Sequence, residues 1–545
     1  MVTNTIILLM EFPVWVLFEY EWWTASLFFI VILASLYTAE VLIKNNYIYF
    51  YTSRNIIHML VGVYISASPL LFKSNFYPIV LALIFIFLNY LSFKYKIFKS
   101  MLSPHRITYG TIYFPIAYII MVVGFWNYPE YLIISLLVLS LSDPLASQVG
   151  NSVKSPIYFK IWDDKKSAQG TITFFISTFF IVFISSQIFF NYSIYLITTF
   201  AIFVSIGATL GEITSTRGTD NLSVPILCIL FMIGFFEIVA NPLNITFYSL
   251  SFDKIITIIF IIIIFLISKY LNALTYSGMF GAIVMGILVT LFGSLQYLIP
   301  LSVFFIFSSF LSKILKSSFY IIKDSQRDII QVYANGGVAL ILCLVNYFNP
   351  SPMILLLFLA SVSSAMSDTW GTEFGKLSKS RPISILTFKS IEHGLSGGIT
   401  RIGTIGSLLG SCLLGFTSWL IIPIPSYLIY GVIISGFAGS IFDSIIGASH
   451  QGKYQTNSGE IIEENLENTT IVSGKTWITN NLVNLLNTIA GPVFMSAYIY
   501  NISILKIGNH TYAHFVLINI YFGLVDNLYS DNGLYYKRQL YFLIH

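Results

Sequence analysis

Two nine-residue segments of the chain share a pattern of residue types that could carry chemistry. Residues 142–150 read SDPLASQVG and residues 367–375 read SDTWGTEFG, so both follow S-D-x-x-[AG]-[ST]-x-x-G. Each segment closes an apolar run and leads into a Lys-bearing polar loop. We therefore expect an acid, a hydroxyl and a small-residue turn at the boundary of a membrane. Such a place can hold a metal and phosphates, and the chain contains it twice.

The acidic residues in apolar segments are candidate metal ligands. Burying an unpaired carboxylate costs several kcal/mol, so an acid inside an apolar helix is a functional hypothesis by default. The alternative is an acid at a helix end that reaches water or pairs with Lys or Arg. Mg²⁺ suits such acids, because it takes one or two carboxylates together with substrate phosphates and water. The predicted ligands are Asp143, Glu212 and Asp220 in the first half, and Asp368 and Asp443 in the second.

Cations and small polar residues near the two signatures are candidates for binding phosphates. Phosphoryl transfer needs positioning and charge compensation, so we predict catalytic roles for Lys166 and Lys389 beside the two aspartates. The alternative for each lysine is an ordinary basic loop at the inner membrane face. Glycines that precede a helix can form an anion cradle or a simple packing contact. The predicted nucleotide-binding residues are Ser147, Gly150, Ser167, Gly170, Asn221, Thr372, Gly375, Gly397, Gly398, Asn480 and Asn484.

Polar residues near the starts of two other helices are candidates for contacting the substrate. Arg54 and His58 have i, i+4 spacing and share one helix face. Arg327 and Asn335 are placed in the same way in the second half. Polar groups spaced along an apolar helix can line a pocket or make hydrogen bonds between helices.

The composition identifies the elements that must position these residues. Of 545 residues, 56% are hydrophobic and only 10% are charged, which excludes a water-soluble globular protein. Apolar runs of roughly 15–20 residues recur along the chain, and each can cross all or most of a bilayer as a helix. We predict an all-α, multi-pass membrane protein with about seventeen spans. They are 25–43, 56–72, 77–92, 111–127, 130–150, 170–190, 192–210, 224–240, 254–271, 279–293, 297–312, 329–347, 353–366, 403–422, 426–446, 481–500 and 512–523.

The distribution of Lys and Arg predicts the orientation of these spans. If the N-terminus lies outside, all 28 Lys and Arg residues except Lys73, Lys254 and Lys506 fall inside, as cytoplasmic loops require. We therefore expect a cell-membrane protein whose sites face the cytoplasm. The net charge of +4 reflects this asymmetry and predicts no nucleic-acid partner. The oligomeric state stays open.

A polar break near residue 250 divides the chain into two predicted domains, 1–250 and 251–545. Eight predicted helices separate the two signatures, so both copies lie on the same side of the membrane. This parity argues against a transporter with inverted repeats, although a transporter with parallel repeats remains an alternative. We expect two distantly related halves in parallel orientation.

Residues about 50–240 resemble the phytol kinase and dolichol kinase group, which is related to phosphatidate cytidylyltransferase. Five blocks in order carry the resemblance: R-x-x-x-H-x-x-x-G at 54–62, YGTIYFP at 109–115, DPLAS-x-x-G at 143–150, KS-x-x-G at 166–170 and DNL-x-VP at 220–225.

Residues about 270–500 resemble the phytyl-phosphate kinase family, which is related to the human membrane protein called transmembrane protein 19. The matching blocks are NALT-x-x-G at 272–278, QV-x-ANG at 331–336, SDT-x-x-x-E-x-G at 367–375, G-x-x-GGIT at 394–400, DS-x-x-GA at 443–448 and N-x-x-VN at 480–484.

The two resemblances together imply consecutive reactions. The first half would phosphorylate an isoprenoid alcohol of the phytol, geranylgeraniol or polyprenol type, and the second would convert the monophosphate to the diphosphate. The resemblance also implies CTP as phosphoryl donor, with Mg²⁺. Asn55, Gln169 and Asn481 depart from residues common in these families and affect the expected loop contacts. An enzyme similar to CTP:phosphatidate cytidylyltransferase is the alternative reaction.

Overall fold

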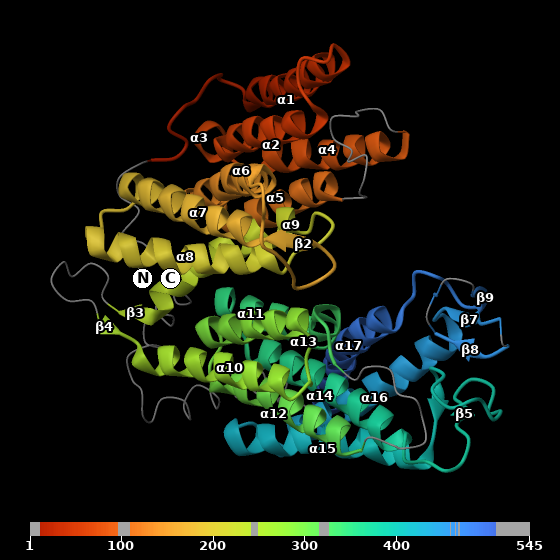
Figure 1. Ribbon diagram of the computed structural model, residues 1–545. Helices are drawn as coiled ribbons and strands as arrows, with labels where there is room; N and C mark the ends of the chain where they lie inside the picture. Colours follow the sequence, from red (N-terminus) through yellow and green to blue (C-terminus); the bar gives the residue numbers. More distant parts are fainter. Residues whose placement is uncertain are drawn as a thin grey trace. The chain divides into compact units, whose positions relative to one another are not determined.

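The computed structural model describes residues 11–95, 109–240, 249–315 and 326–507, apart from residues 458, 464, 467 and 468. Within these ranges the chain forms seventeen helices and nine short strands (Figure 1). Eleven of the helices are long and apolar enough to cross a membrane, and three more are apolar but shorter. The chain divides into two compact units, residues 1–253 and 254–545.

The first unit contains nine helices within its described residues. They are α1 (Glu21–Lys44), α2 (Phe50–Ser66), α3 (Ser68–Leu71), α4 (Phe76–Tyr95), α5 (Gly110–Phe125), α6 (Pro129–Ser152), α7 (Ala168–Phe189), α8 (Ile194–Ile213) and α9 (Asp220–Ile238). Two antiparallel strand pairs occur in this unit: β1 (Tyr158–Lys160) with β2 (Lys165–Ser167), and β3 (Val239–Ala240) with β4 (Ser249–Leu250).

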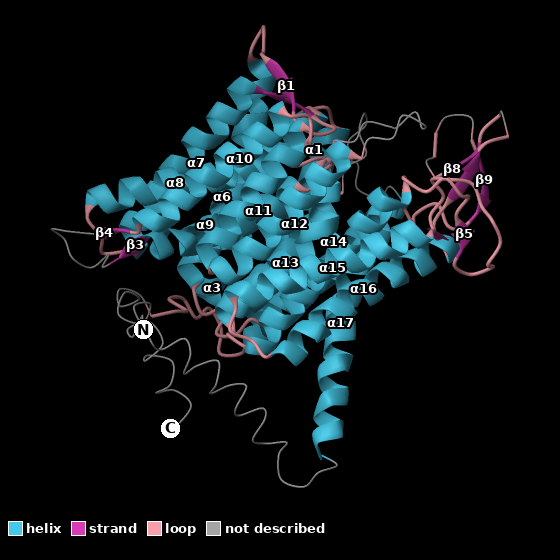
Figure 2. Cartoon of the chain, turned by 90° about the horizontal axis from the view of Figure 1, so that it is seen from below, coloured by secondary structure: helices cyan, strands magenta, loops and turns pink. Residues whose placement is uncertain are grey.

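Eight helices belong to the second unit within the described residues, and the first of them, α10 (Phe252–Tyr270), begins two residues before the boundary between the units. The others are α11 (Tyr276–Phe292), α12 (Leu295–Ile314), α13 (Ile329–Phe348), α14 (Pro352–Gly375), α15 (Arg401–Ile421), α16 (Ser426–Ser449) and α17 (Asn480–Ile507). Strand β5 (Ile383–Ser384) pairs with β6 (Gly398–Ile399), and β7 (Lys453–Gln455) lies between β8 (Ile461–Ile462) and β9 (Thr470–Ser473). Figure 2 shows these strands as short segments in the loops between helices.

The helical fold follows from the apolar runs, because a helix satisfies its backbone hydrogen bonds internally where water is absent. The predicted span 512–523 lies outside the described residues, and each of the other sixteen overlaps an observed helix. The prediction of a helical, multi-pass membrane protein is confirmed. The relation between the two halves stays a prediction.

The expectation of a small-residue turn in the two signatures is wrong. Residues 142–150 form the end of α6, and residues 367–375 form the end of α14. Both helices run about two turns beyond the acid. The small residues do not form a turn and instead allow a neighbouring helix to pack closely. A Cβ on Gly150 would lie 3.6 Å from the Cα of Gly170 on α7, and one on Gly403 of α15 would lie 3.3 Å from the Cα of Gly375.

The signature helix is central to the packing of each unit. In the first unit α6 packs against α2, α7 and α9, and α8 packs against α7 and α9. In the second unit α14 packs against α13, α15, α16 and α17, while α16 contacts α15 and α17. Residues 356–367 of α14 are buried except for Leu357, as is most of α6 before its signature. Each signature aspartate therefore lies where its helix leaves a packed core.

Candidate active site

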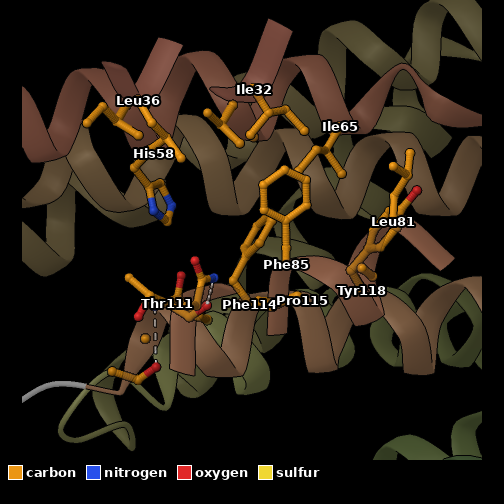
Figure 3. A pocket seen from close by; sticks show the side chains of 18 of the residues that line it. Ile32, Leu36, His58, Ile65, Leu81, Phe85, Thr111, Phe114, Pro115 and Tyr118 are labelled. Carbon is orange, nitrogen blue, oxygen red and sulfur yellow. Dashed lines mark hydrogen bonds between the residues drawn. The ribbon is translucent and has the colours of Figure 1, made fainter. Parts of the chain in front are cut away.

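The first unit encloses a cavity of about 210 Å³ with one polar end (Figure 3). Side chains from α1, α2, α4 and α5 form most of its wall, and most of them are aliphatic or aromatic. Five residues singled out from the sequence lie at the polar end: Arg54, His58, Asp143, Asp220 and Asn221. The fold therefore brings three separate sequence blocks to one cavity that has polar and apolar parts.

A glycine lets α2 approach α6 closely enough to place two of these residues. A Cβ on Gly62 would lie only 2.0 Å from the Ser140 Oγ, so this contact requires glycine. One turn earlier on α2, the His58 Nε2 donates to the Leu139 carbonyl oxygen at 3.2 Å. Asp143 follows Leu139 by one turn of α6. Arg54 lies one turn before His58 and within electrostatic range of Asp143.

A second glycine contact brings the start of α9 to the same end. Gly218 has a φ of +92°, and a Cβ on it would lie 2.5 Å from the Gly110 nitrogen at the start of α5. The Asn221 Nδ2 donates to the Asp220 Oδ1 at 3.1 Å and to the Gly218 carbonyl at 3.3 Å. Both Asp220 and Asn221 line the cavity and lie at the positive N-terminal end of α9.

Lys166 and Glu212 form a partly buried ion pair next to this site. The Lys166 Nζ lies 2.6 Å from the Glu212 Oε1 and donates to the Ser215 Oγ at 3.0 Å and to the Glu212 carbonyl. Their side chains are only 15% and 12% exposed. Asp143 lies within electrostatic range of Lys166 and Glu212. The predicted catalytic lysine is thus held by one of the predicted metal ligands.

Three of the residues predicted to bind nucleotide form the contact between α6 and α7. Ser167 is the N-cap of α7, and its Oγ accepts from the Gly170 nitrogen at 3.1 Å. A Cβ on Gly150 would lie 2.5 Å from this Oγ. Ser147 lies on α6 one turn beyond Asp143. Gly150, Ser167 and Gly170 thus hold the C-terminal end of α6 against the start of α7, next to Lys166 of β2.

The second unit places Asp368 of α14 and Asp443 of α16 within electrostatic range of each other. The Asp443 Oδ2 is buried and has no hydrogen-bond partner within the described residues. A third acid, Glu463, reaches the same region from the loop after β8 and interacts electrostatically with Asp443. Asp443 is therefore within electrostatic range of two other acids, which come from different elements.

Glu463 fixes the glycine loop that precedes α15. Its Oε1 accepts from the Ser396 nitrogen at 2.5 Å, and its Oε2 accepts from the Ser396 Oγ at 2.7 Å and from the Gln451 Nε2 at 2.8 Å. Burial raises the pKa of Glu463, while the Ser396 hydrogen bonds oppose that rise. Gly397 has a φ of +81°, and a Cβ on it would lie 2.3 Å from the Ala448 Cβ. The predicted anion cradle at Gly397 and Gly398 thus packs on the end of α16.

Arg327 and Asn335 line a smaller cavity of about 70 Å³ in the second unit. The wall is apolar, and the Arg327 guanidinium lies 5.9 Å from the centre of the Phe304 ring. Glu373 of α14 interacts electrostatically with Arg327 and accepts from the Lys376 Nζ at 2.9 Å. The Asn335 Oδ1 is buried without a partner among the described residues. An unpaired acceptor and a half-buried cation at an apolar cavity suit a polar head group with an apolar tail.

The remaining predicted residues of the second unit occupy more peripheral positions. Thr372 is exposed on α14, and Lys389 is exposed in the loop between β5 and β6. Gly375 faces the N-cap Thr400 of α15, since a Cβ on it would lie 3.7 Å from the Thr400 Oγ1. Asn480 is exposed at the first residue of α17, and Asn484 lies one turn further along the helix, half-buried.

The donor atoms fit Mg²⁺ only with help from a substrate. In the part of the chain that the structure describes, no three His, Cys, Asp or Glu side chains are grouped to hold a metal ion. Mg²⁺ ordinarily takes one or two carboxylates and completes its six ligands with phosphates and water. Asp143 with Asp220, and Asp368 with Asp443, provide such pairs. The unpartnered Asp443 oxygen is also the kind of atom that a cation would satisfy.

Two residues of these sites were missed by reasoning from sequence. Asn89 of α4 lines the first cavity and donates to the Thr111 carbonyl at 2.7 Å. A polar amide inside an apolar run is the signal that could have revealed it. Glu463 lies in a loop that contains several glutamates, and nothing in its spacing separates it from them.

Comparison with known proteins identifies relatives for part of the chain. Residues 259–492 match the family model of integral membrane protein DUF92. An uncharacterised membrane protein of Methanocaldococcus jannaschii is 29% identical over 208 residues, which are 38% of this chain and 87% of that protein. No solved structure matches the chain.

Two further relatives come from photosynthetic organisms. The phytol kinase of Synechocystis is 29% identical over 138 residues, which cover 25% of this chain and 58% of that enzyme. The chloroplastic protein VTE6 of Arabidopsis thaliana is 25% identical over 164 residues, which cover 30% of this chain and 40% of that protein. Parts of the chain are thus similar to an integral membrane protein family and to a phytol kinase.

Proposed function

We propose that the chain is a membrane-bound isoprenoid kinase with two active sites. The first unit phosphorylates an isoprenoid alcohol, and the second phosphorylates the resulting monophosphate to the diphosphate. CTP is the proposed donor, with Mg²⁺, and both sites face the cytoplasm. Residues 1–250 and 251–545 are the two proposed catalytic domains.

The observation that carries this proposal is the cavity of the first unit. Its apolar wall suits an isoprenoid tail, and its polar end holds Arg54, His58 and Asp143 together. A hydroxyl placed there meets a carboxylate that can accept its proton. The similarity to a phytol kinase supports an alcohol of the same class as substrate.

The proposed chemistry assigns each residue a part in one substitution at phosphorus. The alcohol oxygen attacks the γ-phosphorus of the nucleotide, the bond from that phosphorus to the bridging oxygen breaks, and Asp143 takes the alcohol proton. Arg54 and Lys166 balance the charge on the phosphate oxygens. To bind phosphate, the Lys166 ammonium group must weaken its ion pair with Glu212. Bound Mg²⁺ would add charge compensation between Asp143 and Asp220.

Charged residues of the second unit support the proposed second phosphorylation. Arg327 and Asn335 lie at an apolar cavity and would hold a lipid monophosphate. Asp368 and Asp443 are the corresponding acids for nucleotide and metal. Glu373 places a negative charge within electrostatic range of Arg327, which favours a charged guanidinium there.

The test uses the full-length protein in lipid nanodiscs with geranylgeraniol or phytol, Mg²⁺ and labelled nucleotide. CTP labelled at the γ-phosphorus should transfer label to the lipid, whereas label at the α-phosphorus should not. Asp143→Asn should lower formation of the monophosphate about 10²- to 10⁴-fold, because the base that takes the alcohol proton is lost. Asp368→Asn should accumulate monophosphate, and Glu19→Gln, an exposed acid before α1, is the matched control.

Three results would contradict the proposal. Transfer of the α-phosphorus would indicate a cytidylyltransferase. Absence of any lipid product, combined with uptake of a solute into vesicles, would indicate a transporter. Diphosphate formation at the wild-type rate by both aspartate variants would remove the two signatures from the chemistry.

A further inference from the structure

The cavity of the first unit has a definite direction. On α2 the lining residues run from Arg54 through His58 to Ile65, and on α5 they run from Thr111 through Phe114 to Tyr118. Both series pass from polar to apolar as the residue number rises. A helix rises about 1.5 Å per residue, so the eleven steps from Arg54 to Ile65 span about 16 Å.

The wall helix α4 runs in the opposite sense. On α4 the lining residues pass from Asn89 through Phe85 to Leu81. Figure 3 shows His58 and Thr111 at one end of the cavity, and Ile65, Leu81 and Tyr118 at the other. The apolar ends of the series on α2, α4 and α5 therefore lie together at the far end of the cavity, opposite His58 and Thr111.

The short helix α3 lies at this far end and is fixed by two contacts. The Tyr118 Oη donates to the Ser68 Oγ at 2.7 Å, and both side chains are buried. Phe72, at the C-cap of α3, is only 1% exposed and lines the cavity. Its ring packs edge-on against Phe28 of α1, with centroids 5.3 Å apart. Three helices thus hold the two rings in place.

We infer that Tyr118 and Phe72 form the floor of the cavity and set the longest isoprenoid tail that the first unit accepts. This inference rests on the proposed function. The head group is fixed at Asp143, so a tail that exceeds the depth must displace one of these rings. Forcing extra volume into a packed site is unfavourable, and longer alcohols are therefore rejected.

The inference predicts how the floor variants choose among alcohols. The measurement is kcat/KM for geraniol, farnesol, geranylgeraniol and a longer polyprenol, with full-length protein in nanodiscs. Tyr118→Ala and Phe72→Ala should shift the ratio of longer to shorter alcohol by about tenfold or more toward the longer one. Ile65→Phe, which adds volume beside the floor, should shift the ratio toward the shorter alcohol.

Two control variants separate the floor from the wall. Tyr118→Phe keeps the ring and should keep the wild-type ratio. Phe85→Ala removes a ring from the side wall and should lower kcat/KM for all four alcohols to a similar extent. If Phe85→Ala changes the ratio of kcat/KM for longer and shorter alcohols as much as Tyr118→Ala does, the inference is overturned. The change would then come from any enlargement of the cavity and not from the floor.

Further outcomes distinguish this inference from the proposed function. If the wild type phosphorylates none of the alcohols, the proposed function fails, and thermal stabilisation by each alcohol then tests the floor. That stabilisation should increase with tail length up to one alcohol and fall beyond it. A steady increase through the longest polyprenol, or unchanged ratios in folded Tyr118→Ala and Phe72→Ala, would overturn the inference. If those variants do not fold, Ile65→Phe and the wild-type length profile decide it.

Discussion

At the scale of single residues, the most consequential contact is the ion pair between Lys166 and Glu212. Lys166 would neutralise phosphate, yet in this structure it is held by a carboxylate 2.6 Å away. Its charge is therefore balanced before nucleotide binds, and a phosphate must compete with Glu212 for it. Glu212 thus has two effects: it orients Lys166 near Asp143, and it competes with phosphate for the lysine.

Removing one partner of this pair should destabilise the protein. Lys166→Met leaves Glu212 partly buried without its cation, and we expect a loss of about 3–5 kcal/mol in the free energy of unfolding. The double variant Lys166→Met with Glu212→Gln should recover most of that loss. Unfolding in detergent micelles, analysed as a double-mutant cycle, measures the coupling.

The neighbouring lysine provides the matched control for this prediction. Lys165 is exposed on β2, so Lys165→Met should change the free energy of unfolding by less than about 0.5 kcal/mol. A coupling energy near zero between Lys166 and Glu212 would show that the pair contributes nothing to stability.

At the scale of elements, glycine contacts decide where the signature helices lie. Gly150 and Gly170 bring α6 and α7 together, and Gly375 and Gly403 do the same for α14 and α15. Within a membrane, helix association depends on close packing of small residues, because lipid tails are as apolar as the side chains. The final Gly that both signatures contain is thus explained by packing.

Adding a methyl group at one of these contacts should separate the two helices. A Cβ on Gly170 would lie 3.0 Å from the Ala146 carbonyl oxygen and 2.8 Å from the Ser167 Oγ. Gly170→Ala should therefore lower stability by about 1–3 kcal/mol, which is measurable as a lower Tm in detergent.

Gly124 of α5 provides the control, since a Cβ there would meet no neighbouring helix or side chain within 4 Å, apart from the backbone of α5 itself and the adjacent residues. Gly124→Ala should leave stability unchanged or raise it by up to about 1 kcal/mol, through helix propensity alone. Equal Tm shifts for Gly124→Ala and Gly170→Ala would contradict the packing role of Gly170.

At the scale of the whole molecule, the distribution of basic residues predicts that the Lys389 loop faces the cytoplasm and that Lys73 faces outward. Cys228, Cys343 and Cys412 are replaced by alanine, and single cysteines are introduced as Lys73→Cys or Lys389→Cys at these exposed positions. A membrane-impermeant maleimide added to intact cells should label Lys73→Cys and not Lys389→Cys. Permeabilised cells serve as the control in which both are labelled.

The reverse labelling pattern in intact cells would place the proposed active sites outside, where nucleoside triphosphates are scarce. Labelling of both positions in intact cells would contradict the predicted number of membrane crossings between them. Either result would contradict the prediction that the basic loops, and with them the proposed nucleotide sites, face the cytoplasm.

The amino-acid sequence by itself determined the helices and the main candidate residues. Hydropathy is a local property, so sixteen predicted spans overlap helices in the described residues. The i, i+4 spacing of Arg54 and His58 is equally local, and both residues line the cavity with Asp143. These predictions needed only the period of a helix and the cost of burying charge.

Only the tertiary structure decided which helices meet and what closes the cavity. Tyr118 and Ser68 are 50 residues apart, and Glu463 and Ser396 are 67 apart. A membrane helix satisfies its own backbone, so its sequence does not specify its neighbour. The neighbour depends on how small residues of both helices fit together. That fit decides which two acids lie near each other in each site, that Lys166 pairs with Glu212, and that α3 closes the end of the cavity.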